Sequence, residues 1–137
     1  IAWSPLAGGW LSGRWRKGAE SPTSSRAAML PQRYDLSIPA NHAKLEAADA
    51  LGQLADEAGM GLIDMALAFV IRHPAVTAAI IGPRTMEQLE SQLGAADVHL
   101  DDALLDRIDE IVAPGTNVNP TDAGWTNPAL AAASRRR

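Results

Sequence analysis

Gly82 and Arg84 are the residues best suited to ligand chemistry, because they stand between an apolar run and a polar segment. The run over residues 76–82 predicts a strand buried on both faces, and Thr85 and Gln88 have the spacing of a helix capping box. A strand that leads into a helix N-terminus presents free backbone N–H groups and the positive end of a helix dipole. The Arg84 guanidinium adds a fork suited to phosphate. The alternative is an exposed arginine at an ordinary capped helix.

Hydrophobic periodicity predicts the elements that would position this site. Residues 1–3 predict a short buried strand that ends at Ser4-Pro5. Residues 14–40 hold three prolines and no clear period, which predicts a long loop. Four helices are predicted, over residues 41–58, 62–73, 85–96 and 101–112. Asn41 is the predicted N-cap of the first, and Gly59 its C-terminal stop. The order of these elements indicates an α/β fold with parallel strands.

Composition and charge exclude several classes of function. The chain has 137 residues, of which 47% are apolar and 20% charged, as in ordinary globular domains. A net charge of −4 gives no electrostatic reason to expect nucleic acid or an anionic membrane. The absence of cysteine excludes disulfides, thiolate metal sites and a cysteine nucleophile. No apolar run approaches the roughly 20 residues of a membrane span, so we expect a cytoplasmic location.

The start of the chain indicates that it is part of a larger protein. It begins Ile1-Ala2-Trp3, without a methionine and inside a predicted strand. Two strands do not make a stable parallel sheet, so we expect further strands upstream or from a partner chain. We expect a partly disordered tail over residues 116–137, which end in three arginines.

Two motifs resemble the C-terminal third of the aldo-keto reductases. They are WSPLAGGWLSGRW at residues 3–15 and LAFVIRHPAVTAAIIGPRTMEQLESQLGAAD at residues 67–97. The likeness extends over about residues 1–115 and is strongest to the branch that contains the potassium-channel β subunits. It implies a TIM (β/α)₈ barrel, of which this chain would supply the seventh and eighth strands with their helices. It also implies NADPH as cofactor and a small carbonyl compound as substrate.

The resemblance assigns cofactor-binding roles residue by residue. Trp3 would stack on the nicotinamide ring. The pyrophosphate would lie along Ser4, Pro5, Leu6, Ala7 and Gly8. Arg14 matches a basic residue at the diphosphate, and Arg26 matches a loop arginine that closes over the cofactor. The adenosine 2′-phosphate and the adenine would be held by Gly82, Arg84, Gln88, Ser91 and Gln92. Ser91 stands where an acidic residue is usual and Gln92 where asparagine is usual.

The residues that the family uses for hydride transfer are not matched in this sequence. The family uses a tyrosine acid supported by Lys, Asp and His from the first half of its barrel. Here the one tyrosine, Tyr34, and Lys17 fall in the predicted loop, and Lys44 falls in the first turn of a helix. None stands at a strand end, so we predict no catalytic residue and no carbonyl reduction by the chain alone. The three histidines lack metal-ligand spacing, so no metal site is predicted.

Two further interpretations remain open beside the reductase. One is a non-catalytic regulatory subunit that binds NADPH and senses redox state. The other is a helical interaction domain without a nucleotide, in which Arg84 lies on the surface. Trp10, Trp15 and Trp125 suit either a substrate pocket or packing, and packing is the commoner role of tryptophan.

Overall fold

The computed structural model describes residues 1–123 of the chain. Two strands, β1 (Ala2–Trp3) and β2 (Ala79–Ile80), pair in parallel, which confirms the predicted strand orientation. The α-helices of the described range are α1 (Ser25–Met29), α2 (Pro39–Glu57), α3 (Leu62–Arg72), α4 (Met86–Leu93) and α5 (Asp102–Ile111). Short 3₁₀ turns are η1 (Ala7–Gly9), η2 (Pro31–Arg33), η3 (Gly94–Asp97) and η4 (Pro120–Ala123). The predicted tail lies partly beyond this range, and Trp125 lies outside it.

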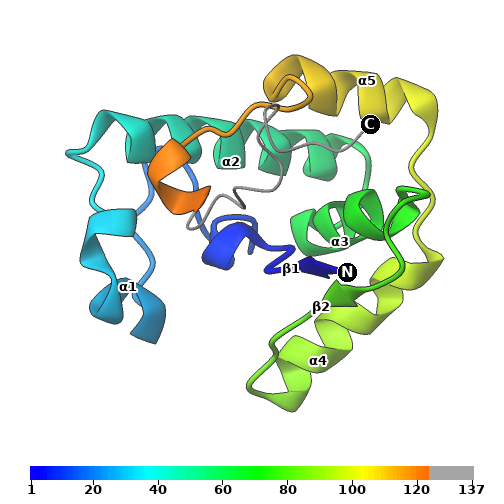
Figure 1. Ribbon diagram of the computed structural model, residues 1–137, viewed down its shortest axis with the longest axis horizontal. Helices are drawn as coiled ribbons and strands as arrows, with labels where there is room; N and C mark the ends of the chain where they lie inside the picture. Colours follow the sequence, from blue (N-terminus) through cyan, green and yellow to red (C-terminus); the bar gives the residue numbers. More distant parts are fainter. Residues whose placement is uncertain (124–137) are drawn as a thin grey trace, which may run out of the picture.

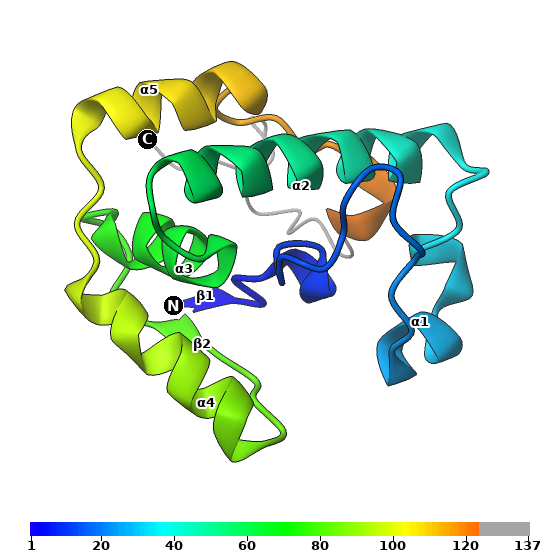
Figure 2. The same ribbon diagram turned by 180° about the vertical axis from the view of Figure 1, so that it is seen from behind.

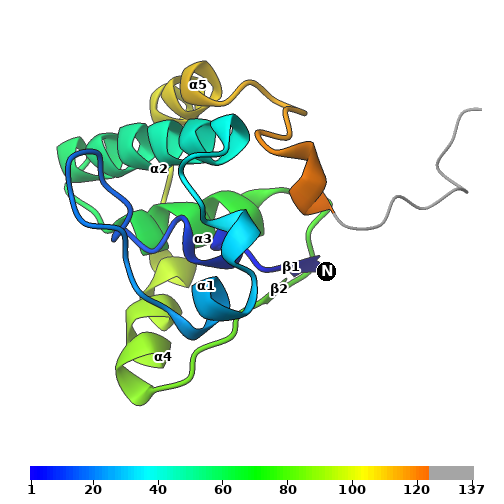
Figure 3. The same cartoon turned by 90° about the vertical axis from the view of Figure 1, so that its left-hand side faces the viewer.

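The helices are stacked in layers around the strand pair (Figure 1). α5 packs on α2, and α3 contacts α2, α4, η3 and β2, so α3 is the central helix. The side view in Figure 3 gives the same order, from α5 and α2 through α3 and the sheet to α4. α1 stands apart from these layers in Figure 1 and in the view from behind in Figure 2.

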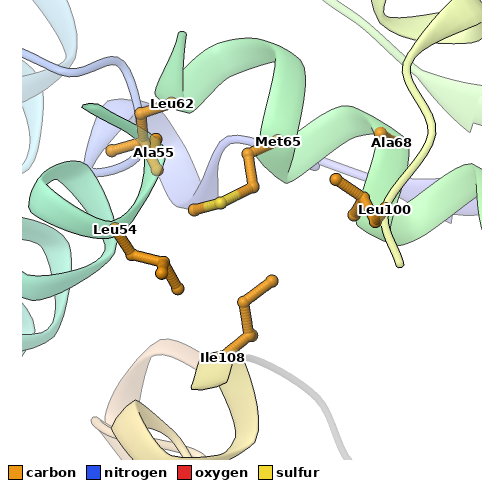
Figure 4. Close-up of a cluster of buried hydrophobic side chains, with 7 residues drawn as sticks. All are labelled: Leu54, Ala55, Leu62, Met65, Ala68, Leu100 and Ile108. Atoms are coloured by element: carbon orange, nitrogen blue, oxygen red, sulfur yellow. The ribbon is translucent and has the colours of Figure 1, made fainter. Parts of the chain in front are cut away.

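The main core lies between α2, α3 and α5 (Figure 4). Met65 of α3 is 1% exposed, and Leu54 of α2 and Ile108 of α5 point toward it. These side chains lie on the buried faces of three of the four predicted helices. Burial of each contributes about 1.5–3 kcal/mol. The helices therefore have a hydrophobic core that does not involve the strands.

The ends of α2 confirm one sequence prediction and correct another. Gly59 follows the helix with a φ of 71°, the left-handed conformation expected of a glycine stop. The assignment of Asn41 as N-cap is wrong, because Pro39 occupies the first turn and starts the helix earlier. Asn41 is fully buried, and its amide donates to the carbonyls of Gln32 at 2.8 Å and Asp35 at 2.9 Å. It anchors the preceding loop.

Two other expectations are wrong for physical reasons. The strands are not buried, since Trp3 is 74% and Ile80 58% exposed. Within residues 1–123 the sheet has two strands, so no further strand flanks the pair. The predicted loop over residues 14–40 contains α1 and η2, which are too short to produce a helical period in the sequence. The Ser24 hydroxyl caps α1 by accepting the Ala27 N–H at 3.0 Å.

None of the helices in the described range has the length and apolar character needed to cross a membrane.

Candidate functional site

An open groove of about 910 Å³ lies beside the end of β1. Its walls come from the end of β1, the residues between α1 and α2, the facing sides of α2 and α3, and the segment after α5. The predicted cofactor residues that line it are Trp3, Ser4, Pro5, Ala7, Gly8 and Arg26. A space of this size accommodates a small-molecule ligand. The first predicted phosphate segment therefore borders a ligand-sized groove.

The backbone after β1 forms a tight turn with several left-handed residues. Ser4 has a φ of 54°, Ala7 of 49° and Gly8 of 71°. The Gly8 N–H donates to the Ser4 Oγ at 3.2 Å, and the Ala7 N–H donates to the Ser4 carbonyl at 2.9 Å. Left-handed conformations of non-glycine residues are strained and concentrate at functional sites. The turn is thus held in one shape by its own hydrogen bonds.

A cluster of aromatic side chains supports this turn. Trp10 stacks on Trp15 with ring centroids 4.1 Å apart and on Tyr34 at 5.7 Å. Trp10 is 4% and Trp15 5% exposed. Both therefore act mainly in packing, which is a commoner role of tryptophan than lining a substrate pocket. The Tyr34 hydroxyl donates to the Gly8 carbonyl at 2.8 Å, which ties the aromatic stack to the turn.

The segment after β2 is held by a helix cap. The Thr85 Oγ1 accepts the Gln88 N–H at 3.2 Å, as predicted for a capping box. The Gln88 Oε1 accepts the Arg84 N–H at 2.9 Å, one residue before the position usual in that motif. The Arg84 guanidinium extends away from α4, and its Nη1 donates to the Ser25 Oγ at 2.5 Å. Arg84 therefore connects the start of α4 to α1.

The other predicted residues of this segment differ in accessibility. Ser91 is exposed, and its hydroxyl donates to the Gln88 carbonyl at 3.0 Å. Gln92 is 9% exposed and donates to the same carbonyl at 2.8 Å, so it is the least accessible residue of the set. The segment after β2 does not line the groove. Arg14 also lies outside it, with its Nε near the Ser12 Oγ at 3.5 Å.

Ion pairing divides the arginines of the described range into two groups. Four of them pair with a carboxylate at 2.6 to 3.5 Å: Arg16, Arg33, Arg72 and Arg107. Arg14, Arg26 and Arg84 have no such partner within residues 1–123. Residues 124–137 contain no Asp or Glu. The three arginines without a carboxylate partner in the described range are the three assigned to the cofactor from the sequence.

The groove also contains charged residues that the sequence motifs did not identify. Lys44 donates to the Asp122 carboxylate at 2.6 Å and lies 4.7 Å from the centre of the Trp10 ring. The Arg33 Nε lies 3.5 Å from the other Asp122 oxygen. Because these contacts join residues far apart in the chain, no local motif indicates them. They fix the segment after α5 as one wall of the groove.

Burial raises the pKa of the Tyr34 hydroxyl above its usual value of 10.0, and the positive charges of Arg26 and Arg33 partly oppose the rise. The phenol is therefore neutral at pH 7 and acts as the hydrogen-bond donor to the Gly8 carbonyl.

Among the described residues, no three His, Asp or Glu side chains gather closely enough to hold a metal ion.

Comparison with known proteins identifies the family. A family model for the aldo/keto reductase family matches residues 1–113. The chain belongs to the aldo-keto reductase family. It is 32% identical over 125 residues to the uncharacterized oxidoreductase YrpG of Bacillus subtilis, covering 91% of this chain and 35% of that protein. It is also 32% identical over 112 residues to a probable voltage-gated potassium channel subunit beta of Arabidopsis thaliana, covering 80% of this chain and 34% of that protein.

The family assignment confirms the resemblance drawn from the two motifs. A protein of Schizosaccharomyces pombe named as a putative voltage-gated potassium channel subunit beta is 26% identical over 112 residues. The match covers 80% of this chain and 33% of that protein. The chain spans about a third of the length of the curated relatives it matches. Aldo-keto reductases are oxidoreductases that generally use NADP(H) and fold as TIM barrels. A parallel strand pair flanked by helices is consistent with part of such a barrel.

Proposed function

We propose that residues 1–115 form the NADPH-binding C-terminal part of an aldo-keto reductase, with residues 116–137 as its tail. β1 and β2 would be the last two strands of the barrel. The complete protein would reduce aldehydes or ketones to alcohols by hydride transfer. The main support is the coincidence of the cofactor arginines Arg14, Arg26 and Arg84 with the arginines that lack a carboxylate partner in the described range. Such uncompensated guanidinium groups suit a ligand that has several phosphates.

The position of the two segments on the fold also supports this function. Both begin where a parallel strand ends, at Trp3 and at Ile80. The ends of parallel strands lie at one edge of a sheet, and such barrels often hold phosphate in the loops after their last two strands. Trp3 is 74% exposed beside the groove, so its indole face is accessible for stacking on a nicotinamide ring. The left-handed turn that follows places Ser4, Ala7 and Gly8 along the wall of the same groove, where the pyrophosphate would lie.

We propose that the chain alone binds the cofactor without turnover. Tyr34 is its one tyrosine, and that hydroxyl is already hydrogen-bonded to the Gly8 carbonyl. Lys17 pairs with Glu46 at 2.5 Å and Lys44 with Asp122 at 2.6 Å. None of these groups has the free, strand-end position that a proton donor for hydride transfer needs.

The exposed apolar residues in and beside the sheet support association with further polypeptide. Ile1, Trp3 and Ile80 are each more than half exposed, and two paired strands are a marginal sheet in water. We propose that the remaining strands of the barrel, on the same or another chain, would cover them.

The second candidate is a regulatory subunit that binds NADPH and senses its redox state. Three relatives named as potassium channel β subunits favour this alternative. The two functions differ in one measurable respect. In a protein that contains the complete barrel, the reductase oxidises NADPH when a carbonyl compound is added, and the regulatory subunit does not.

A titration with NADPH and NADH, followed by tryptophan fluorescence, tests cofactor binding. We expect saturable quenching that favours NADPH by about ten-fold, since one hydrogen bond to a charged group contributes about 1.5–3 kcal/mol. Arg84→Ala should remove this preference. Arg107→Ala is the matched control, because that arginine pairs with Glu57 at 2.6 Å on a different helix.

Each outcome of this titration has a distinct meaning. A folded chain that binds neither nucleotide contradicts cofactor binding by these residues alone. Saturable binding that is equal for Arg84→Ala and the unmodified chain contradicts a ligand role for Arg84, and binding of neither nucleotide is the result expected of the helical interaction domain.

A further inference from the structure

Ser25 joins two segments that lie 59 positions apart in the sequence. The Arg84 Nη1 donates to the Ser25 Oγ at 2.5 Å, and both residues are exposed. A serine hydroxyl that accepts one hydrogen bond still has its own proton to donate. The Arg84 guanidinium has further N–H groups besides the one that donates to Ser25. The two side chains therefore present several hydrogen-bond donors together at an accessible position.

The residue next to Ser25 contacts the other predicted segment. Arg26 lines the groove with Gly8, and its Cδ would lie 3.8 Å from a side chain begun at Gly8. Ser25 and Arg26 are consecutive residues of α1, which stands apart from the helical layers in Figure 1. One short element thus reaches the segment after β2 through Ser25 and the segment after β1 through Arg26.

We propose that Ser25 selects for the phosphate group of the cofactor by binding the adenosine 2′-phosphate together with Arg84. This inference rests on the proposed function. Both side chains are donors and no carboxylate pairs with Arg84 within the described range, so the pair matches a dianion. NADH has a hydroxyl at that position, which accepts fewer hydrogen bonds and has no charge. Ser25 therefore contributes to the preference for NADPH rather than to nucleotide affinity in general.

The test compares NADPH and NADH affinities of the full chain and its variants by tryptophan fluorescence. For Ser25→Ala we expect the Kd for NADPH to rise about five- to ten-fold and the Kd for NADH to change less than about two-fold. Ser25→Thr keeps the hydroxyl and should retain most of the preference. Ser25→Asp places a carboxylate against Arg84 and should weaken NADPH binding more than about ten-fold. Ser21→Ala, which removes another exposed hydroxyl from the segment just before α1, should change neither affinity.

The variants also separate this inference from the proposed function. An unmodified chain that binds neither nucleotide overturns both. An unmodified chain that prefers NADPH, combined with a Ser25→Ala variant that matches Ser21→Ala or loses both nucleotides equally, overturns the role of Ser25 alone. Ser25→Ala should have no further effect in the Arg84→Ala background, because both residues act on the same phosphate. Circular dichroism verifies that each variant is folded.

Discussion

The two strand ends at the candidate site are built in different ways. After β1 the backbone itself makes the site, in a left-handed turn that is supported by the buried ring of Trp10 and the half-buried ring of Tyr34. After β2 the backbone is conventional, and exposed side chains of Arg84 and Gln88 make the site. The first end has no basic side chain within the turn. The second has a long cation that reaches another element.

Under the proposed function, one ligand would be bound by two kinds of structure. A turn supported by packed rings keeps its shape without a ligand, because deformation would disturb the core. An exposed arginine adapts its side chain to a phosphate but loses side-chain entropy when it is fixed. We therefore expect substitutions after β1 to change stability first and binding second. Substitutions after β2 should change binding with little effect on stability.

Replacement of the buried ring tests the first half of this comparison and should have the largest effect. Trp10→Ala removes a side chain that is 4% exposed and stacks on both Trp15 and Tyr34, so we expect a loss of about 3–5 kcal/mol in the free energy of unfolding. Trp3→Ala is the matched control, since that ring is 74% exposed and should cost about 0.5 kcal/mol or less. Urea denaturation followed by circular dichroism measures both. Equal losses would contradict a supporting role for the stack.

The glycine in the turn provides a smaller and more local test. Gly8→Ala introduces a Cβ in the left-handed region, at 3.1 Å from the Tyr34 hydroxyl oxygen. We expect a loss of about 1–2 kcal/mol from backbone strain, and about 1 kcal/mol more from the displaced hydrogen bond. Gly18→Ala is the control, because Gly18 has a similar φ of 76° and its Cβ would meet no atom within 4 Å. Denaturation midpoints that agree for the two variants would show that the Tyr34 contact has no energetic weight.

The features that could be predicted from the sequence are those set by neighbouring residues. The bounds of α3, the glycine stop at Gly59 and the Thr85 cap each depend on residues within one helical turn, and all three are confirmed. The family assignment was also possible, because its two motifs are continuous in the sequence. Of the candidate site, the exposed indole of Trp3 and the absence of a carboxylate partner for Arg84 could only be seen in the folded chain.

The errors arose where contacts between distant segments override local preference. Asn41 has a good capping side chain but is buried against a loop six to nine residues earlier in the chain and against Asn119. The sequence gives no sign of the Tyr34 to Gly8 and Arg84 to Ser25 contacts, which join positions 26 and 59 residues apart. Such pairings depend on the fold. Periodicity and spacing cannot predict them.

The helix cap tests the second half of the comparison. Thr85→Ala removes the oxygen that accepts the Gln88 N–H at 3.2 Å, and we expect a loss of about 1 kcal/mol in the free energy of unfolding. Thr85→Ser keeps the hydroxyl and should restore most of it. Urea denaturation detects the change, and nucleotide titration of the same variants shows whether Arg84 still binds. A loss as large as that of Trp10→Ala would contradict the view that this end is only locally held.

Titration of Tyr34 should give the smallest effect and reports directly on the turn after β1. Burial raises the pKa of this hydroxyl above 10.0, so at alkaline pH the folded chain retains a proton that the unfolded chain releases. The resulting stability is complete below the ordinary tyrosine pKa and is lost as pH rises through the folded pKa. Because the chain has one tyrosine, phenolate absorbance follows it alone, with the chain in urea as reference. Arg26→Ala should raise the pKa further, since that charge favours the phenolate. A folded-state pKa at or below that in urea would mean that the ring is open to water, and that the turn lacks its support.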